Sequence, residues 1–426
     1  MAINSKNKVP EFSIEQEQNE FAASTEREKI KGSKNLNVPP LRFPEFTDEW
    51  TKSTIGDCFE LYSGNTPSRL DKKNFSGEIN WITSGELKEH YIGETKEHIS
   101  EEVVKENNLK LIPVGTFVIA IYGLEAEGVR GTGSITMQKS TISQACMAFT
   151  PTSMITNEFL YSWYKKHGNA IGIKYAQGTK QQNLCYEIIE KFKIQYPSLK
   201  EQEKLNHFIS LLDERIATQS RIIDKLQSLM SGICERLSYS DMGENIKLGD
   251  ILLERIEKTT KNNQYEILSS TVKGIFLQRE YFSKDIASED NIGYKVVRLN
   301  DIVLSPQNLW MGNINFNDKF QIGAVSPSYK VFTIAEQFYK PFISAILKTR
   351  RALYNYELVS EQGASIVRRN LNMEAFEQLT FKIPSYDRQV QIGNVILTLQ
   401  HRIDLTKKLY SAMIQQKQWF LQQMFI

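Results

Sequence analysis

The chain of 426 residues is long enough for two or three domains, and its 41% hydrophobic residues supply a core for each of them. Its 52 basic and 50 acidic side chains almost balance, which excludes a polycation that binds nucleic acid through bulk charge alone. The four cysteines form no CxxC pair and the five histidines show no zinc-ligand spacing, so we expect no metal site and a reduced, cytoplasmic compartment.

The N-terminal segment, 1–38, is polar and charged, and large apolar side chains are rare in it. Such a segment buries too little surface to offset the entropy of ordering, so it is predicted to form a flexible extension. The sequence contains neither a long apolar run nor a signal-peptide pattern, which predicts neither a membrane span nor secretion.

The next segment, 39–197, is predicted to form a first domain of mixed α and β structure. Residues 79–87 and 111–123 have the alternation and the β-branched content of buried strands. A glycine-rich loop follows the second of these, and residues 157–167 have helical spacing. A glycine-centred polar loop, 175–184, comes just before the strand that ends the domain.

Residues 198–240 are predicted to form a long central helix. A proline followed by serine, Pro197 and Ser198, is a typical helix entry. Apolar side chains then recur at alternating spacings of four and three, with one polar exception, which is the pattern of a coiled-coil seam. The seam consists of Leu205, Ile209, Leu212, Ile216, Gln219, Ile223 and Leu226.

The C-terminal segment, 385–426, repeats this helix, with Gln389 where the first copy has Gln202. Two helices of about 38 residues would each be roughly 57 Å long at about 1.5 Å per residue. We expect them to pack antiparallel, which would bring the polar seam positions Gln219 and Thr406 together. The second seam consists of Ile392, Ile396, Leu399, Ile403, Thr406, Tyr410 and Met413.

The intervening segment, 241–384, repeats the plan of the first domain and is predicted to form a second one. Residues 296–305 parallel the buried strand at 111–123, and residues 361–371 parallel the polar loop at 175–184. The predicted fold is therefore mixed α and β, with two globular domains of related plan separated by two long antiparallel coiled-coil helices in a pseudo-two-fold internal repeat.

Sequence motifs of common catalysts are absent. The glycine-rich loop has neither GK[ST] nor a dinucleotide spacing, and no methyltransferase motif or adenosyl-binding glycine loop occurs. Carboxylates such as Glu201 and Asp213 fall on helix faces, where a solvated position is expected. We therefore predict no catalytic residue, no bound cofactor and no metal ligand in this chain.

Residue types that read DNA bases gather in equivalent polar loops of the two domains. Arginine pairs with guanine, and asparagine or glutamine with adenine, in the major groove, while lysine and arginine neutralise phosphate. These side chains could instead only solvate their loops, but both loops come just before the strand that leads into a long helix, which favours a shared function. Trp81, Trp163 and Trp310 are expected in the core rather than as stacking platforms. The principal candidates are Lys180, Gln181, Gln182, Asn183, Arg368, Arg369 and Asn370, and the weaker ones are Arg69, Arg130, Lys139, Gln307 and Asn308.

Several short motifs are specific when taken together. They are SGNTPSR (63–69) followed by NWITSGEL, LIPVGTFVIA followed by the glycine-rich loop, SPSYKVF in the second half, and the paired helix entries PSLKEQ and PSYDRQ. With these motifs the chain resembles the specificity subunit of type I restriction-modification enzymes over residues 39–426. SGNTPSR has no counterpart in the second half of the chain.

The resemblance implies that each domain is a target recognition domain that reads one half of a bipartite site on double-stranded DNA. It implies that the helix pair sets the gap between the halves and docks two methyltransferase (modification) subunits. Catalysis would belong to these and to restriction (motor-nuclease) subunits. S-adenosylmethionine, ATP and magnesium are accordingly expected in the partner subunits.

Two other classes of protein stay open at this point. The seam could join two chains into a homodimeric coiled-coil scaffold that binds protein or glycan without DNA specificity. Self-association without salt-sensitive DNA binding would indicate that class. An enzyme whose site is assembled from polar residues outside known motifs is the second alternative, and turnover by the purified chain would indicate it.

Overall fold

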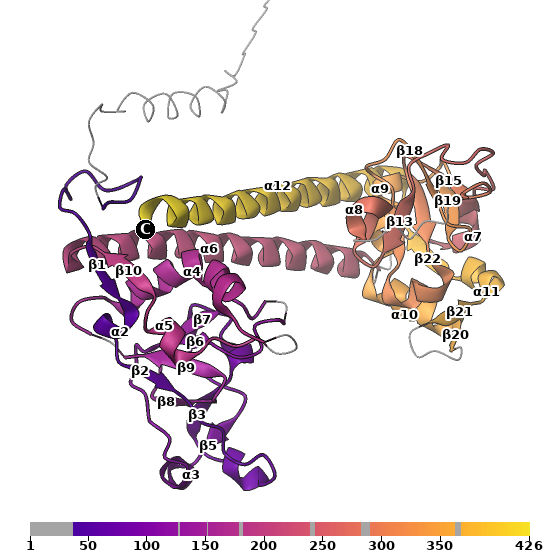
Figure 1. The fold of residues 1–426 in the computed structure, drawn as a ribbon. Coiled ribbons are helices and arrows are strands. Elements are labelled where there is room, and N and C mark those ends of the chain that lie inside the picture. Colours follow the sequence, from indigo (N-terminus) through magenta and orange to yellow (C-terminus); the bar gives the residue numbers. More distant parts are fainter. Residues whose placement is uncertain are drawn as a thin grey trace, which may run out of the picture. The chain divides into compact units, whose positions relative to one another are not determined.

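The computed structural model describes residues 37–126, 128–150, 152–178, 182–238, 243–282, 290–362 and 368–426. The chain forms two compact units (Figure 1). Unit 1 combines the chain up to Leu212 with Gln415–Ile426, and unit 2 is Asp213–Ile414. The predicted extension, 1–38, lies outside the described residues except for its last two positions. The predicted domain boundaries stay a prediction, because each unit includes part of both long helices.

Unit 1 is built around a five-stranded sheet in the order β2-β9-β6-β7-β4. All neighbours in it are antiparallel except β4 and β7. Every residue of β6 and β9 is buried, which explains their continuously apolar sequences, FVIA and CMAF. The strands are β2 (Leu61–Ser63), β9 (Cys146–Phe149), β6 (Phe117–Ala120), β7 (Gly133–Thr136) and β4 (Tyr91–Ile92).

Smaller sheets and helices complete unit 1. The predicted strand at 79–87 ends at Ile82, because the Glu86 carboxylate accepts a 2.9 Å hydrogen bond from the Thr83 N–H and starts the short helix η2. The additional strands are the pair β1 (Thr51–Thr54) and β10 (Lys193–Tyr196), and the three-stranded sheet β5 (His98–Ile99), β3 (Ile79–Ile82) and β8 (Ser140–Ile142). The helices are α2 (Ile55–Cys58), η1 (Lys72–Phe75), η2 (Ser84–Glu86), α3 (Glu101–Glu106), α4 (Asn157–Tyr175), α5 (Tyr186–Ile189) and the start of α6 (Leu199–Ser238).

Unit 2 contains a four-stranded antiparallel sheet in the order β12-β19-β16-β17. Its strands are β12 (Leu252–Glu254), β19 (Lys330–Ile334), β16 (Asp301–Leu304) and β17 (Ile314–Phe316). The remaining pairs are β11 (Glu244–Lys247) with β22 (Thr380–Ile383), β13 (Leu268–Thr271) with β14 (Gly274–Leu277), β15 (Lys295–Arg298) with β18 (Ile322–Val325), and β20 (Ser360–Gln362) with β21 (Arg369–Leu371). The helices are α7 (Leu248–Ile251), α8 (Gln278–Tyr281), η3 (Pro306–Met311), α9 (Lys340–Ile346), α10 (Arg350–Leu358), α11 (Met373–Gln378) and α12 (Tyr386–Met424).

Four neighbouring strands follow the same order in the main sheets of the two units. The order β2-β9-β6-β7 of unit 1 returns in unit 2 as β12-β19-β16-β17, and the pair β1–β10 returns as β11–β22. One difference lies after the sheet, where unit 1 has the single helix α4 and unit 2 has α9 and α10, divided at the N-cap residue Thr349. The predicted internal repeat is thus confirmed in the order of the strands.

The predicted seam joins the two long helices within one chain. In unit 1, Leu205 near the start of α6 shares a core with Leu421 near the end of α12. In unit 2, Met230 near the end of α6 packs against the core that contains Ile392, near the start of α12. The helices therefore run antiparallel, as predicted, and the seam is used for an internal pair rather than for a pair of chains.

Along this seam the helices bury one narrow face. Every predicted seam position is buried or half-buried, whereas the neighbouring Leu229 and Leu405 are 53% and 51% exposed. The Thr406 hydroxyl donates to the Arg402 carbonyl of its own helix at 2.7 Å. In the described part of the chain no hydrogen bond joins Thr406 to Gln219, so the expected polar layer is not held by a contact of that kind.

A buried glutamine joins the start of α6 to the rest of unit 1. Gln202 is fully buried, and its Oε1 accepts a 2.9 Å hydrogen bond from the backbone N–H of Thr156, the N-cap residue of α4. Its Nε2 donates to the carbonyls of Met154 and Pro197 at 2.9 and 3.0 Å. One amide side chain therefore links two helix starts and the chain segment that precedes each of them.

Unit 2 uses the same device at the corresponding residue. Gln389 is 3% exposed, its Oε1 accepts from the backbone N–H of Tyr339 at 2.9 Å, and its Nε2 donates to the Pro384 carbonyl at 2.9 Å. Tyr339 is the N-cap residue of α9, the counterpart of α4. The repeat thus extends from strand order to single hydrogen bonds.

The expectation of a solvated carboxylate at Glu201 is wrong. Glu201 is 1% exposed, and its two oxygens each accept a 2.7 Å hydrogen bond from Arg42, with Trp50 Nε1 at 3.3 Å. A bidentate arginine pair and an indole N–H satisfy the buried charge, which fixes the segment before β1 to the start of α6.

We predict that Gln389→Leu lowers the free energy of unfolding by about 2–3 kcal/mol, because the Tyr339 N–H and the Pro384 carbonyl lose their buried partner. Urea unfolding of the full chain, followed by fluorescence and circular dichroism, measures the loss. The matched control is Gln418→Leu, at an exposed position of the same helix, which should change stability by less than about 0.5 kcal/mol. Equal stability of the two variants would contradict the structural role of Gln389.

Candidate functional site

In each unit, the loops that contain the candidate residues lie at one end of the strands of the main sheet. This end of the strands is called the sheet edge below. In unit 1, β6 ends at Ala120, which pairs with Cys146 at the start of β9. The glycine-rich loop leaves β6 at this edge. In unit 2, β16 ends at Leu304, which pairs with Lys330 at the start of β19. Helix η3, which contains Gln307 and Asn308, leaves β16 at the equivalent edge.

The glycine-rich loop of unit 1 is bound to the polar loop that precedes α5. Backbone hydrogen bonds of 2.9 and 3.0 Å run from Leu184 N to the Ile121 carbonyl and from Leu124 N to the Gln182 carbonyl. Asn183 exchanges two backbone hydrogen bonds of 2.9 Å with Gln177. The two loops are therefore brought together although β7, β8, β9 and α4 lie between them in the sequence.

Side chains reinforce this loop pair. Arg130 Nη2 donates to Gln182 Oε1 at 2.7 Å, and the Gln182 N–H donates to Glu125 Oε2 at 2.7 Å. That backbone hydrogen bond, with the nearby Arg130 charge, lowers the pKa of the Glu125 carboxyl. The Arg130 stem lies against Gly172 of α4, where an added Cβ would be 2.4 Å from Cγ. Glycine at position 172 thus makes room for the arginine.

In unit 2, the candidate loop is the β20–β21 hairpin, which packs beside η3. Arg369 lies on β21 with its guanidinium carbon 4.5 Å from the ring centroid of Trp310, and its Nη2 lies 2.9 Å from Glu357 Oε1 of α10. Its neighbours Arg368 and Asn370 are exposed. The hairpin therefore presents one arginine held on an aromatic ring between two polar side chains that face solvent.

Both loop pairs contain hydrogen-bonding atoms that the described part of the chain leaves unpaired. These buried atoms are Arg130 Nε and Asn183 Oδ1 in unit 1, and Arg369 Nε and Asn308 Oδ1 in unit 2. A buried polar group without a partner costs about 1–3 kcal/mol. Such groups are expected where a polar ligand or ordered water completes a site, and here they occur at equivalent places in the two units.

The remaining candidates that the structure describes are Arg69, Lys139 and Gln307. Arg69 pairs with both oxygens of Glu97 at 2.5 and 2.9 Å and stacks on Phe75 and Trp81. Lys139 is exposed in the turn between β7 and β8, and Gln307 is exposed on η3. Lys180 and Gln181 lie outside the described residues.

Sequence reasoning was correct for two of the tryptophans and wrong for one. Trp81 and Trp163 are 1% and 5% exposed and belong to the core. Trp310 is half-buried and carries Arg369 on its face. Pro306 opens the segment, and proline is common at the first position of a helix. This was the available signal that Trp310 lies on a short helix.

Among the described residues, no group of three or more His, Cys, Asp or Glu side chains is arranged to hold a metal ion. No helix in the described ranges is long and apolar enough to cross a membrane.

Part of the chain is similar to a known family. Residues 47–228 match the family model of the type I restriction modification DNA specificity domain. The matched segment contains the whole main sheet of unit 1 and most of α6. The predicted resemblance to type I specificity subunits is confirmed by this match.

Particular relatives carry the same description. The chain is 26% identical over 267 residues to the type I restriction enzyme MjaIX specificity subunit of Methanocaldococcus jannaschii, which covers 57% of this chain and 60% of that protein. It is 26% identical over 201 residues to the type I restriction enzyme EcoR124I/EcoR124II specificity subunit of Escherichia coli, which covers 46% of this chain and 45% of that protein. The chain thus spans about half the length of the curated relatives that it matches.

Among solved structures, the S subunit of a type I restriction-modification system from M. genitalium has the same fold. The TM-score is 0.53 at 15% sequence identity, and the match covers 91% of this chain and 99% of that chain. The predicted fold class, with mixed α and β units and long antiparallel helices, is confirmed.

Proposed function

We propose that this chain is the DNA sequence-specificity subunit of a type I restriction-modification complex. In this proposal each unit reads one half of a bipartite site on double-stranded DNA through the loops at its sheet edge. The observation that carries the proposal is the repeat of one framework, in which equivalent edges present Arg130, Gln182 and Asn183 in unit 1 and Arg368, Arg369 and Asn370 in unit 2. Arginine and amide side chains are the residues that distinguish guanine and adenine in the major groove.

The long helices supply the second element of the proposal, which is a spacer. A helix rises about 1.5 Å per residue, so in this proposal the length of the paired helices would determine the gap between the two half-sites. Two readers on one duplex must match its helical repeat of about 34–36 Å. The alternative, a homodimeric scaffold without DNA specificity, loses its main support, because the seam that would join two chains is occupied within one.

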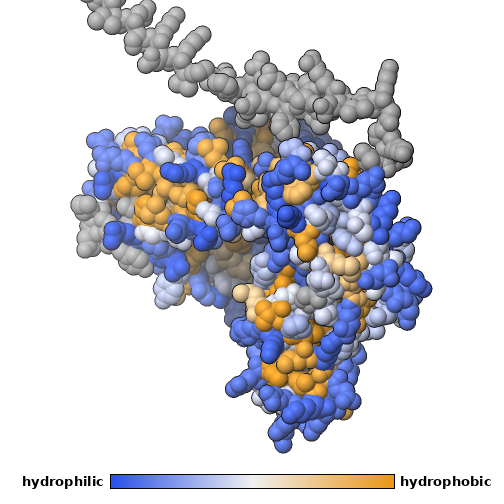
Figure 2. Space-filling view, turned by 90° about the vertical axis from the view of Figure 1, so that its left-hand side faces the viewer, coloured by the Kyte–Doolittle hydropathy of each residue, from blue (hydrophilic) through white to orange (hydrophobic). Residues whose placement is uncertain are grey.

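The third element is the docking of partner subunits. Off the seam, the helices expose large apolar side chains, including Leu211 and Leu229 on α6 and Leu409 and Trp419 on α12. Figure 2 shows hydrophobic areas among hydrophilic ones on one face of the molecule. Exposed apolar surface of this kind fits binding of other protein chains. We assign to it two methyltransferase subunits, with restriction subunits joining the complex.

Under this proposal the chain does no chemistry of its own. S-adenosylmethionine would be held by the methyltransferase subunits, and ATP and magnesium by the restriction subunits. The role of this chain would be to bind the DNA and to orient it so that the partner enzymes reach an adenine in the site.

Loss of one arginine should weaken one half of the recognition. We predict that Arg369→Ala weakens binding by about 1–3 kcal/mol at the half-site that unit 2 reads and leaves the other half unchanged. Binding of the complex to duplexes with single base changes in each half measures this. Arg388→Ala, at an exposed position on α12, is the control and should change neither half. Equal loss at both halves would sink the assignment of Arg369.

Exchange of a whole unit tests the division of labour. We predict that replacing residues 241–380 with the corresponding segment of another specificity subunit changes one half of the methylated sequence and keeps the other. Methylation mapping in cells that carry the hybrid gives the answer. An unaltered target would refute the reading role of unit 2.

The spacer role predicts a change in length. Inserting one heptad after Gln219 and one after Thr406 lengthens the helix pair by about 10 Å, so the gap between half-sites should grow by roughly three base pairs. The hydrophobic seam continues through whole heptads, and the pair should remain folded. An unchanged gap in the methylated motif would show that the helices do not set the spacing.

A further inference from the structure

A second group of charged side chains lies at the same sheet edge of unit 2 as the reading loops. Glu254 ends β12 and Lys330 opens β19, and both strands reach the edge at which β16 ends at Leu304 and continues into η3. Lys295 opens β15, and Lys258 forms an isolated β-bridge with it. A network of arginines and carboxylates forms one charge cluster, and these four residues form a second one beside it.

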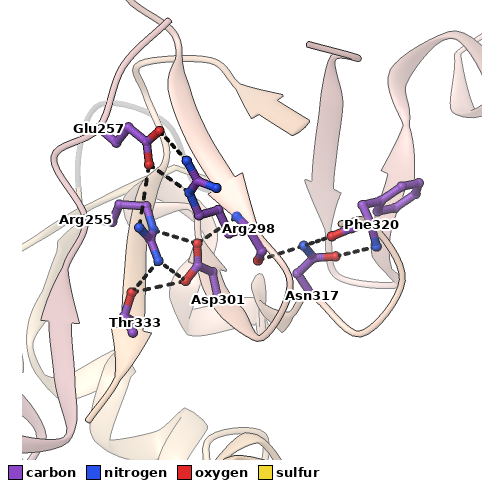
Figure 3. A network of polar contacts seen from close by, with 7 residues as sticks. All are labelled: Arg255, Glu257, Arg298, Asp301, Asn317, Phe320 and Thr333. Carbon is purple, nitrogen blue, oxygen red and sulfur yellow. Dashed lines mark hydrogen bonds and ion pairs between the residues drawn. The ribbon is translucent and has the colours of Figure 1, made fainter. Parts of the chain in front are cut away.

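The first cluster is a network of arginines and carboxylates that is electrically balanced (Figure 3). Asp301 is 1% exposed and accepts from Arg255 Nε and Nη2 at 2.8 and 3.0 Å. Glu257 accepts from Arg298 Nε and Nη2 at 3.0 and 2.8 Å, which lowers the pKa of its carboxyl. Two positive charges face two negative charges, so this network stabilises the fold and has no charge left for a ligand.

The second cluster is made of lysines and is unbalanced. Lys330 Nζ lies 2.7 and 3.0 Å from the two oxygens of Glu254, and Lys295 Nζ lies 3.8 Å from one of them. Within the described ranges, Lys258 has no carboxylate at ion-pair distance. Three positive charges against the one of Glu254 leave a local charge of +2.

The lysine charges also affect one another. The side chain of Lys295 is only 14% exposed. Burial lowers the pKa of its amine, and the charges of Lys330 and Lys258 lower it further. The carboxylate of Glu254 acts in the opposite direction and raises it. Like charges held together in this way repel, and an anion would relieve the repulsion. A cluster of cations that its own fold does not neutralise is typical of a surface that binds an anion.

We propose that Lys258, Lys295 and Lys330 bind phosphate groups of the DNA backbone and thereby position the β20–β21 hairpin over the base edges. The inference rests on the proposed DNA-binding function and adds to it a site for a different part of the DNA. Lysine is suited to this role, because it recognises phosphate as a compact charge without reading sequence. The lysines and the reading loop share one edge, so one duplex can contact both.

The salt dependence of DNA binding tests the inference. The full chain, in complex with its methyltransferase subunits, is titrated into a labelled duplex of arbitrary sequence, about 30 base pairs long, between about 50 and 200 mM salt. The double variant Lys295→Gln, Lys330→Gln should reduce the slope of log K against log salt by about 1.8, that is by about 0.9 for each lost phosphate contact. The loss should be the same for every sequence tested.

Variants with matched chemistry separate this role from a structural one. Lys247→Gln removes an exposed lysine of β11, which precedes the start of β12, and should leave the slope unchanged. Glu254→Gln should tighten binding to every duplex, because it removes the charge that competes with phosphate. If the double variant does not fold, the single variant Lys258→Gln is used in its place. The Lys258 side chain is exposed and forms no ion pair among the described residues. Its replacement should reduce the slope by about 0.9.

The outcomes distinguish the inference from the function on which it rests. Salt-dependent binding by the wild-type complex together with an unchanged slope for the lysine variants would overturn the phosphate site and leave the specificity function intact. A wild-type complex that shows no salt-dependent DNA binding would overturn the proposed function and this inference with it. A reduced slope with unchanged preference between sequences would establish the site.

Discussion

The buried glutamine at the start of each long helix is the contact on which the arrangement of each unit depends. Gln202 and Gln389 connect the first turn of a spacer helix to the N-cap of the helix that follows the sheet, through hydrogen bonds of 2.9–3.0 Å. A buried amide can satisfy both its oxygen and its nitrogen only in one orientation, so the join fixes direction as well as position. A spacer can set a distance between reading loops only if each unit is attached rigidly to it.

The same sheet edge carries the candidate loops in both units. The strand order is identical for four strands, while the loops at the edge are built from different residues. Unit 1 pairs Arg130 on its first loop with Gln182 on the second, and unit 2 places Arg369 on its second loop over Trp310 on the first. A common framework with interchangeable loops is what a protein needs if its two halves are to read different sequences.

The long-range plan of this protein could be predicted from its sequence because it depends on patterns that are local and repeated. The 3-4 spacing of the seam and its second copy in the C-terminal segment predicted the helix pair and the internal repeat. Contacts between distant residues could not be predicted in this way. Glu201 looks solvated in its helical pattern and is buried because Arg42, far away in the sequence, reaches it. The sequence placed one candidate loop in each domain, but the stacking of Arg369 on Trp310 depends on a packing that spacing does not encode.

The lysine cluster illustrates the same limit. Lys258, Lys295 and Lys330 are separated along the chain, and the registers of β15 and β19, together with the isolated β-bridge between Lys258 and Lys295, bring them to one edge. Charge counts over the sequence therefore gave no sign of it, since the chain as a whole is almost neutral. Local excess charge can arise in a balanced protein when neighbouring carboxylates are already paired, as they are in the adjacent arginine network.

The most direct test of the central claim is a map of methylated adenines in cells that express this chain with its methyltransferase subunit, read by single-molecule sequencing. The proposed function predicts a two-part motif with a fixed gap that appears when the chain is present and is absent when it is omitted. A folded complex that methylates without any such motif, or the same motif in the absence of this chain, would contradict the claim that the chain determines the sequence that is read.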